Sequence, residues 1–326
     1  SAERKAADKS KIANTAAYYA AFVALEVVMA SLGPTLPGLA ANTQTLLSEI
    51  SFLFTARSLG YLLGSLLGGR LYDRMPGHPV IGVMLLVMAG MMGLAPLMPL
   101  LWLLTLVLLV LGLAEGTVDV GGNTLLVWVH RHRVGPYMNA LHFFFGVGAF
   151  ISPIIIAQAL LLSGGITWGY WTLGLLMIPV ALYILRLPSP AGQSVAKDGS
   201  RPTVYVNRLL VLLIALFFFL YVGAEVSFGG WIFTYTVALG LAGEAAAAYL
   251  TSAFWGALTV GRLLAIPIAA RFRPRYILLG DLTGCLISVA IILLWPGSLV
   301  AVWIGTLGIG AAMASIFPTT LSLAER

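Results

Sequence analysis

Long apolar stretches alternate with short polar or proline- and glycine-containing breaks along the whole chain. A helix needs about 20 mostly apolar residues to cross roughly 30 Å of hydrocarbon. The pattern therefore predicts an all-α polytopic membrane protein with ten spans. The expected spans cover approximately residues 16–40, 49–69, 79–98, 101–128, 136–162, 168–187, 208–239, 245–270, 275–295 and 298–322.

The basic residues indicate how these spans are oriented. Apart from Arg57 and Arg262, all of the 18 Lys and Arg residues lie on one side of the expected spans. Short cytoplasmic loops are enriched in Lys and Arg. We therefore expect the N-terminus, the 188–207 loop and the C-terminus on the cytoplasmic side of the cell inner membrane. The net charge of +6 is then a topology signal, because nucleic-acid binding needs a clustered basic face.

The composition agrees with a bilayer protein and excludes several classes of function. Hydrophobic residues make up 60% of the 326 residues and charged residues only 9%, against about 25% charged in soluble domains. The single cysteine, Cys285, excludes disulfides and cysteine metal sites, and no metal site is expected. The chain has no nucleotide-binding loop, HExxH sequence or nucleophile elbow, so neither an enzyme nor an ATP-driven pump is predicted.

The chain also contains an internal repeat on either side of its longest polar segment, residues 188–207. Glu26 and Glu225 lie 199 residues apart, and Arg70 and Arg271 lie 201 apart. LGLAEGTVDVGGNTL (111–125) aligns with LGIGAAMASIFPTTL (307–321) at an offset of 196. Such a parallel repeat of six-helix units is the layout of the two halves of major facilitator transporters. A ten-helix drug/metabolite-type transporter would need an inverted repeat after five spans.

The repeat predicts the domain organisation. We expect a cytoplasmic tail at 1–15, a six-helix bundle at 16–187, an inter-bundle loop at 188–207 and a second bundle at 208–326. The second bundle has helices 7–10 only, because nothing corresponds to spans 5 and 6. The sequence therefore predicts a piece of a twelve-helix protein of about 380 residues.

Several stretches resemble known families. GGRLYDRMPGH (68–78) resembles the loop 2–3 signature of the major facilitator superfamily. Three further blocks resemble the sodium-dependent glucose transporter group on the fucose-permease (fucose:proton symporter) branch, and the second block is the most specific. The blocks are SLGPTLPGLAANT (31–43) with FLFTARSLGYLLGS (52–65), GTVDVGGNTLLVWV (116–129) with MNALHFFFGVGAFISPII (138–155), and GAEVSFGGWIFTYTV (223–237) with FWGALTVGR (254–262).

The resemblance implies two six-helix bundles that rock around a central sugar site, with uptake driven by a cation gradient. In fucose permease an acid in helix 4 precedes an asparagine by four residues, and Asp119 and Asn123 have that spacing here. An aspartate late in helix 1 of fucose permease has no match, since Glu26 lies more than a turn before the corresponding place.

Ionisable residues inside spans cost about 2.5–3.5 kcal/mol each and are functional candidates. Glu26 and Arg57 lie near midplane and could pair, and Arg262 and Asp281 are expected to form a structural pair on adjacent spans. Glu115, Asp119 and Asn123 share one helix face at i, i+4 spacing. Their oxygens suit a cation or sugar hydroxyls. The residues expected to couple to Na⁺ or H⁺ are Asp119, Glu115 and Glu26.

A further set of residues is expected to bind substrate. His142 lies at about the depth of Asn123 and could bind sugar, carry a proton or donate to a backbone carbonyl. Glu225 with Trp231 and Tyr235 is typical of a sugar site, although Trp and Tyr are also ordinary interface residues. The predicted substrate-binding residues are Asn123, Asn139, His142, Glu225, Trp231 and Tyr235.

Glycines, prolines and charged residues near the span ends predict further local features. Glycines at 60, 64 and 68 permit close helix approach, and Pro34 with Pro37 is expected to break span 1 near its outer end. Glu49 and Glu244 are expected at helix N-termini. The predicted cytoplasmic gate consists of Gly69, Arg70, Asp73 and Arg74.

The expected function is secondary active transport of a hexose or related sugar by alternating access, coupled to Na⁺ or H⁺. No other cofactor is expected. A non-transporting sugar receptor, or a facilitator that exports lipid or drugs on the same scaffold, is the alternative. The expected partners are the sugar and the lipid bilayer, not nucleic acid, and the protein is expected to be a monomer.

Overall fold

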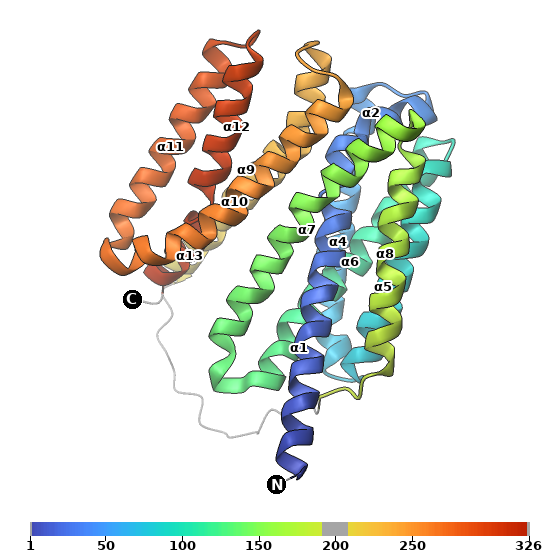
Figure 1. Ribbon diagram of the computed structural model, residues 1–326, viewed down its shortest axis with the longest axis vertical. Helices are drawn as coiled ribbons and strands as arrows, with labels where there is room; N and C mark the ends of the chain where they lie inside the picture. Colours follow the sequence, from blue (N-terminus) through green and yellow to red (C-terminus); the bar gives the residue numbers. More distant parts are fainter. Residues whose placement is uncertain (1, 191–207, 325–326) are drawn as a thin grey trace. The chain divides into compact units, whose positions relative to one another are not determined.

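The computed structural model describes residues 2–190 and 208–324, and its regular elements there are all helices (Figure 1). Ten of the described helical segments are long and apolar enough to cross a membrane, which confirms the ten expected spans. Most of the predicted 188–207 loop, with Lys197 and Arg201, lies outside the described residues, and so does Arg326. The chain divides into two compact units, residues 1–192 with 244–252 and residues 193–243 with 253–326.

Unit 1 is a bundle in which α1 lies against α6, α7 and α8, α4 packs on α6, and α5 packs on α6 and α8. Its core includes the fully buried side chains of Tyr18, Phe22 and Tyr170. The elements are α1 (Ala2–Met29), α2 (Leu32–Thr43), α3 (Leu47–Ile50), α4 (Phe52–Tyr72), α5 (Gly77–Leu94), η1 (Ala95–Leu97), α6 (Leu101–His130), η2 (Arg131–Arg133), α7 (Val134–Ser163), α8 (Thr167–Arg186) and the first residues of α10 (Glu244–Arg271).

Unit 2 contains the remaining helices. Phe233 and Phe254 are almost completely buried in it, and α11 packs against α12 and α13. Its elements are α9 (Arg208–Ala238), the rest of α10, α11 (Pro274–Leu294), α12 (Leu299–Met313) and α13 (Ile316–Ala324).

The first span is broken earlier than predicted. The break lies at Ala30 and Ser31, between α1 and α2, and α2 continues through both prolines. Proline lacks an N–H, and its ring clashes with the carbonyl four residues earlier. For Pro34 that carbonyl belongs to Ala30, so the helix ends there. Pro34 is tolerated as the third residue of α2 because first-turn N–H groups have no helical partner.

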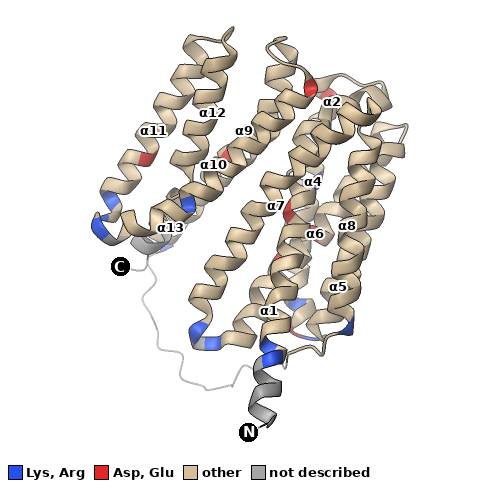
Figure 2. Cartoon of the chain, in the orientation of Figure 1, with Lys and Arg blue, Asp and Glu red and all other residues tan. Residues whose placement is uncertain are grey.

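The helix ends carry the expected charges. Glu49 lies in the first turn of α3, where its Oε2 accepts from the backbone N–H of Leu46 at 2.9 Å. Glu244 is the first residue of α10. Both agree with acids favoured by the helix dipole. Within unit 1, Lys and Arg gather at the end of the bundle where α1 begins and α8 ends (Figure 2).

Helices α4 and α6 approach each other through glycines on both surfaces. A Cβ added at Gly60 or Gly64 would collide with the backbone of Leu109 and Leu113 on α6. A Cβ at Gly112 or Gly116 would collide with the backbone of α4. The close approach expected from the glycine spacing of span 2 is thus confirmed, and α6 contributes a second row of glycines that the prediction did not include.

Replacing Gly64 or Gly112 by alanine is expected to destabilise the protein. The added methyl group meets backbone, which cannot rotate away, so each change costs about 1–3 kcal/mol by overpacking. Thermal unfolding in detergent measures the effect. Gly90→Ala is the matched control, because a Cβ there meets open space on α5. Equal unfolding temperatures for all three variants would contradict the backbone contact.

Candidate functional site

A buried ion pair connects α4 to α6. Nε and Nη2 of Arg57 donate to the two carboxylate oxygens of Glu115 at 2.9 and 2.5 Å. Nη1 of Arg57 donates to the carbonyl oxygen of Met29 on α1 at 3.1 Å. The Arg57 side chain is 9% exposed and that of Glu115 is 1% exposed. This two-pronged geometry is the strong form of a carboxylate–guanidinium pair.

The Arg57–Glu115 pair differs from the expected partner of Arg57 and bears on the expected coupling role of Glu115. Arg57 forms its ion pair with Glu115, whereas Glu26 was the expected partner. The reason is helix rotation, since equal depth in the membrane does not make two side chains face each other. Both oxygens of Glu115 accept from Arg57, so this carboxylate has less capacity for a coupling ion than expected. Glu26 is buried on α1.

One turn further along the same helices, Asp119 is held by two neutral donors. The hydroxyl of Tyr61 on α4 donates to its Oδ2 at 2.6 Å. Nδ2 of Asn123 donates to its Oδ1 at 3.2 Å and to its backbone carbonyl at 2.9 Å. Among the described residues, no Lys or Arg forms an ion pair with Asp119. The predicted acid and amide therefore do lie together, with a tyrosine as third member.

The other predicted polar residues of unit 1 lie on α7. His142 is exposed, and its ring lies 6.2 Å from that of Phe22 and 6.4 Å from that of Phe145, centroid to centroid. Asn139, three residues earlier, is also exposed.

In unit 2 the predicted acid Glu225 lies beside Arg262. Nη2 of Arg262 is 3.6 Å from Oε1 of Glu225, and Glu225 is only 8% exposed. The two aromatic residues predicted near it differ in exposure: Trp231 is exposed and Tyr235 is half-buried on the same helix, α9. The expected sugar-binding group of span 7 therefore includes a carboxylate that an arginine partly neutralises.

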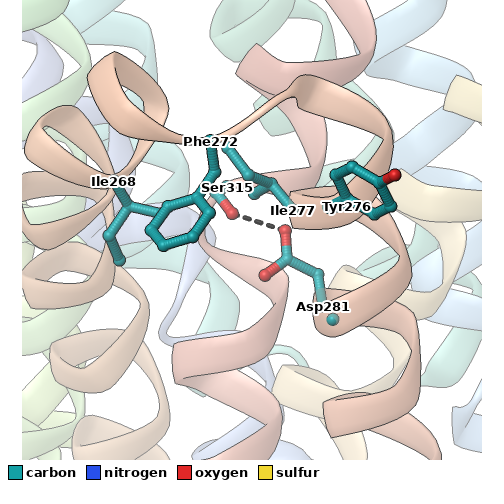
Figure 3. A pocket seen from close by; sticks show the side chains of 7 residues that line it. Ile268, Phe272, Tyr276, Ile277, Asp281 and Ser315 are labelled. Carbon is teal, nitrogen blue, oxygen red and sulfur yellow. Dashed lines mark hydrogen bonds between the residues drawn. The ribbon is translucent and has the colours of Figure 1, made fainter.

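The expected pair between Arg262 and Asp281 does not form, because Arg262 lies against Glu225. Asp281 instead accepts a hydrogen bond from the hydroxyl of Ser315. The two side chains border a cavity of about 390 Å³ with mainly apolar walls (Figure 3). Its lining residues are Ile268, Phe272, Tyr276, Ile277, Gly280, Asp281 and Ser315.

The predicted cytoplasmic gate lies at the end of α4 and just beyond it. Arg70, Asp73 and Arg74 are exposed, and no ion pair joins them within the part of the chain that the structure describes. A Cβ added at Gly69 would meet open space. Tyr72, between these residues, is buried and donates to the carbonyl of Thr117 on α6 at 2.9 Å.

Sequence reasoning missed two tyrosines that complete these groups. Tyr61 lies four residues after Arg57, as Asp119 lies four residues after Glu115, and both contacts join residues 58 positions apart. This equal spacing identifies Tyr61 as the partner of Asp119 only once Arg57 is known to face Glu115. Tyr221 lies four residues before Glu225, and its hydroxyl donates to the carbonyl of Met313 at 3.0 Å.

Arg57→Leu and Glu115→Leu are each expected to destabilise the protein strongly. Removing one member of a buried pair leaves an uncompensated charge, at about 3–5 kcal/mol, whereas removing both avoids that charge. The double variant should therefore unfold at a higher temperature in detergent than either single variant. A double variant whose loss equals the sum of the two single losses would contradict the pairing. Glu244→Gln, at an exposed helix start, is the control.

Comparison with known proteins identifies relatives of the chain. It is 34% identical over 328 residues to sodium-dependent glucose transporter 1 of Xenopus laevis, covering 92% of this chain and 67% of that protein. It is 32% identical over 344 residues to sodium-dependent glucose transporter 1 of Homo sapiens, covering 94% of this chain and 66% of that protein. The chain thus spans about two thirds of these relatives, and the resemblance inferred from the sequence blocks is confirmed.

The fold has solved counterparts. The xylose transporter XylE from E. coli, in a partially occluded inward-open conformation, matches with a TM-score of 0.76 at 13% identity, covering 97% of this chain and 86% of that one. At that identity the match shows the fold alone. The family model of the Major Facilitator Superfamily matches residues 17–326. With ten apolar spans in the residues that the structure describes, and a match to that model over nearly its whole length, the chain belongs to the Major Facilitator Superfamily.

Proposed function

We propose that the protein is a secondary active transporter of a hexose or related sugar, with Asp119 as the residue that couples transport to Na⁺ or H⁺. The observation that carries the proposal is the environment of Asp119. Its carboxylate lies in a membrane span, and its hydrogen-bond partners are the hydroxyl of Tyr61 and the amide of Asn123. The sugar is suggested by the names of the relatives, which are sodium-dependent glucose transporters.

An unneutralised carboxylate in a span is costly, and neutral donors do not remove its charge. Glu115 already has Arg57 as its counterion. Asp119 has no basic partner among the described residues, so a proton or a sodium ion from solution is the natural source of positive charge. Tyr61 and Asn123 orient the carboxylate and leave it able to accept a cation. This favours Asp119 over Glu115 as the coupling residue.

The proposed sugar-binding residues are Asn123, Asn139, His142, Glu225, Trp231 and Tyr235. Amide, imidazole and carboxylate groups match the donors and acceptors of sugar hydroxyls. Trp231 and Tyr235 offer apolar ring faces for the less polar side of a sugar ring. Asn139, His142 and Trp231 are exposed on their own units, which a residue that contacts substrate requires.

The proposal includes the expected topology and division of the chain. Residues 16–187 form the N-terminal bundle and residues 208–326 belong to the second bundle, with the N-terminus in the cytoplasm. The distribution of Lys and Arg supports this orientation. The exposed residues Arg70, Asp73 and Arg74 then lie on the cytoplasmic side, where the proposed gate is located.

Asp119→Asn is expected to abolish gradient-driven uptake. The amide keeps the size of the side chain but carries no charge for a cation to neutralise. We expect purified protein in proteoliposomes to accumulate labelled glucose when an inward Na⁺ or H⁺ gradient is imposed. The accumulation reached by the variant should be at least tenfold lower than that of the parent protein. Exchange of labelled for unlabelled sugar without a gradient should persist.

Two controls make the result specific. Glu244→Gln removes an exposed acid at the start of α10 and should transport like the parent protein. Comparing a sodium gradient with a proton gradient in the parent identifies the coupling ion. If Asp119→Asn accumulates sugar normally, the coupling role is wrong. If the parent binds glucose without exchange or accumulation, the receptor alternative is favoured instead.

A further inference from the structure

One seven-residue pattern occurs twice in the chain, each time where a spanning helix is broken. Residues 29–35 read MASLGPT and residues 313–319 read MASIFPT. In the first copy α1 ends at Met29 and α2 begins at Leu32. In the second copy α12 ends at Met313 and α13 begins at Ile316. We name these the first break and the second break.

The proline explains why both copies interrupt the helix at the same place. Pro34 and Pro318 are each the third residue of the helix that follows the break. Each lacks an N–H and excludes the carbonyl four residues earlier, that of Ala30 or Ala314. Within the first break the backbone N–H of Ser31 bonds three residues back, to the carbonyl of Val28 at 3.1 Å. Of the carbonyls just before the breaks, those of Val27, Met29 and Met313 lose the N–H four residues later that a continuous helix would supply.

At the first break, side chains from two other helices occupy carbonyls that the break releases. Arg57 on α4 donates to the Met29 carbonyl at 3.1 Å. The hydroxyl of Ser152 on α7 donates to the Val27 carbonyl at 2.5 Å. Both carbonyls belong to the last turn of α1, so α4 and α7 restrain the end of that helix.

At the second break one released carbonyl is occupied, and a side chain inside the break donates to a further helix. The hydroxyl of Tyr221 on α9 donates to the Met313 carbonyl at 3.0 Å, the position that matches Met29 in the first copy. The hydroxyl of Ser315, inside the break, donates to Asp281 on α11. Asp281 and Ser315 also line the cavity of about 390 Å³ described above (Figure 3).

We propose that the two copies are a matched pair of hinges, at which α2 and α13 bend relative to α1 and α12, and that Ser152 and Tyr221 restrain them. The inference goes beyond the proposed function, because it assigns movement to two particular places and restraint to particular side chains. In the proposed topology span 1 leaves the cytoplasm and span 10 returns to it. The first hinge therefore lies towards the outer surface and the second towards the cytoplasmic surface.

Hydrogen–deuterium exchange of the full chain in detergent tests the proposal. Ser152→Ala and Tyr221→Phe each remove one hydroxyl without introducing a charge. Loss of one hydrogen bond should speed amide exchange roughly two- to tenfold where the bond restrains opening. Ser152→Ala should do so in residues 30–37 and Tyr221→Phe in residues 314–320, so each segment is the control for the other variant.

Two further variants separate a hinge from a rigid kink and from a general loss of stability. Pro318→Ala restores an N–H, so the helix can continue through the second break, and exchange in 314–320 should slow. Tyr183→Phe, an exposed position on α8, should change neither segment. Unchanged exchange at 314–320 in Tyr221→Phe, or a uniform rise over the whole chain, would overturn the proposal. The measurement needs no sugar or gradient, so failure of the transport proposal would not affect it.

Discussion

The backbone-to-backbone approach of α4 and α6 is the contact on which the polar part of unit 1 depends. Helices ordinarily pack with their axes about 8–10 Å apart, and glycines allow a closer approach. Because the glycines of the two helices interlock, Arg57 reaches Glu115 and Tyr61 reaches Asp119 in one repeating register. Without that approach, several costly polar groups would lie in a span without partners. The same contact thus stabilises the bundle and orients the proposed coupling residue.

The spans and the close approach of span 2 were predictable because they depend on composition and local spacing alone. The partner of Arg57 was not, because it depends on the rotation of each helix about its own axis. Depth placed Arg57 level with Glu26, but rotation turned it towards Glu115. The same limit explains Arg262, which faces Glu225 on α9 instead of Asp281 on α11. Tyr61 follows from the same rotation, because it lies one turn after Arg57 and faces Asp119, one turn after Glu115.

The broken spans show that a proline predicts an interruption of the helix but not the residue at which the helix ends. Prolines in span 1 predicted an interruption, but a proline acts on the carbonyl one turn earlier, so the break precedes it. Which side chains then occupy the released carbonyls depends on tertiary packing. Arg57, which neutralises Glu115 and also bonds the Met29 carbonyl, links the charge arrangement of α6 to the end of α1. A change at Arg57 therefore affects both Glu115 and the end of α1.

The interlocked glycines also constrain how the gene can vary. Every single-base change in the first two positions of a glycine codon yields either a residue with a Cβ or a stop codon. At Gly60, Gly64, Gly112 and Gly116 any Cβ meets the backbone of the neighbouring helix. A change at any of these positions therefore forces α4 and α6 apart or strains their backbones. Four codons in two distant stretches of the gene are therefore under one and the same steric constraint.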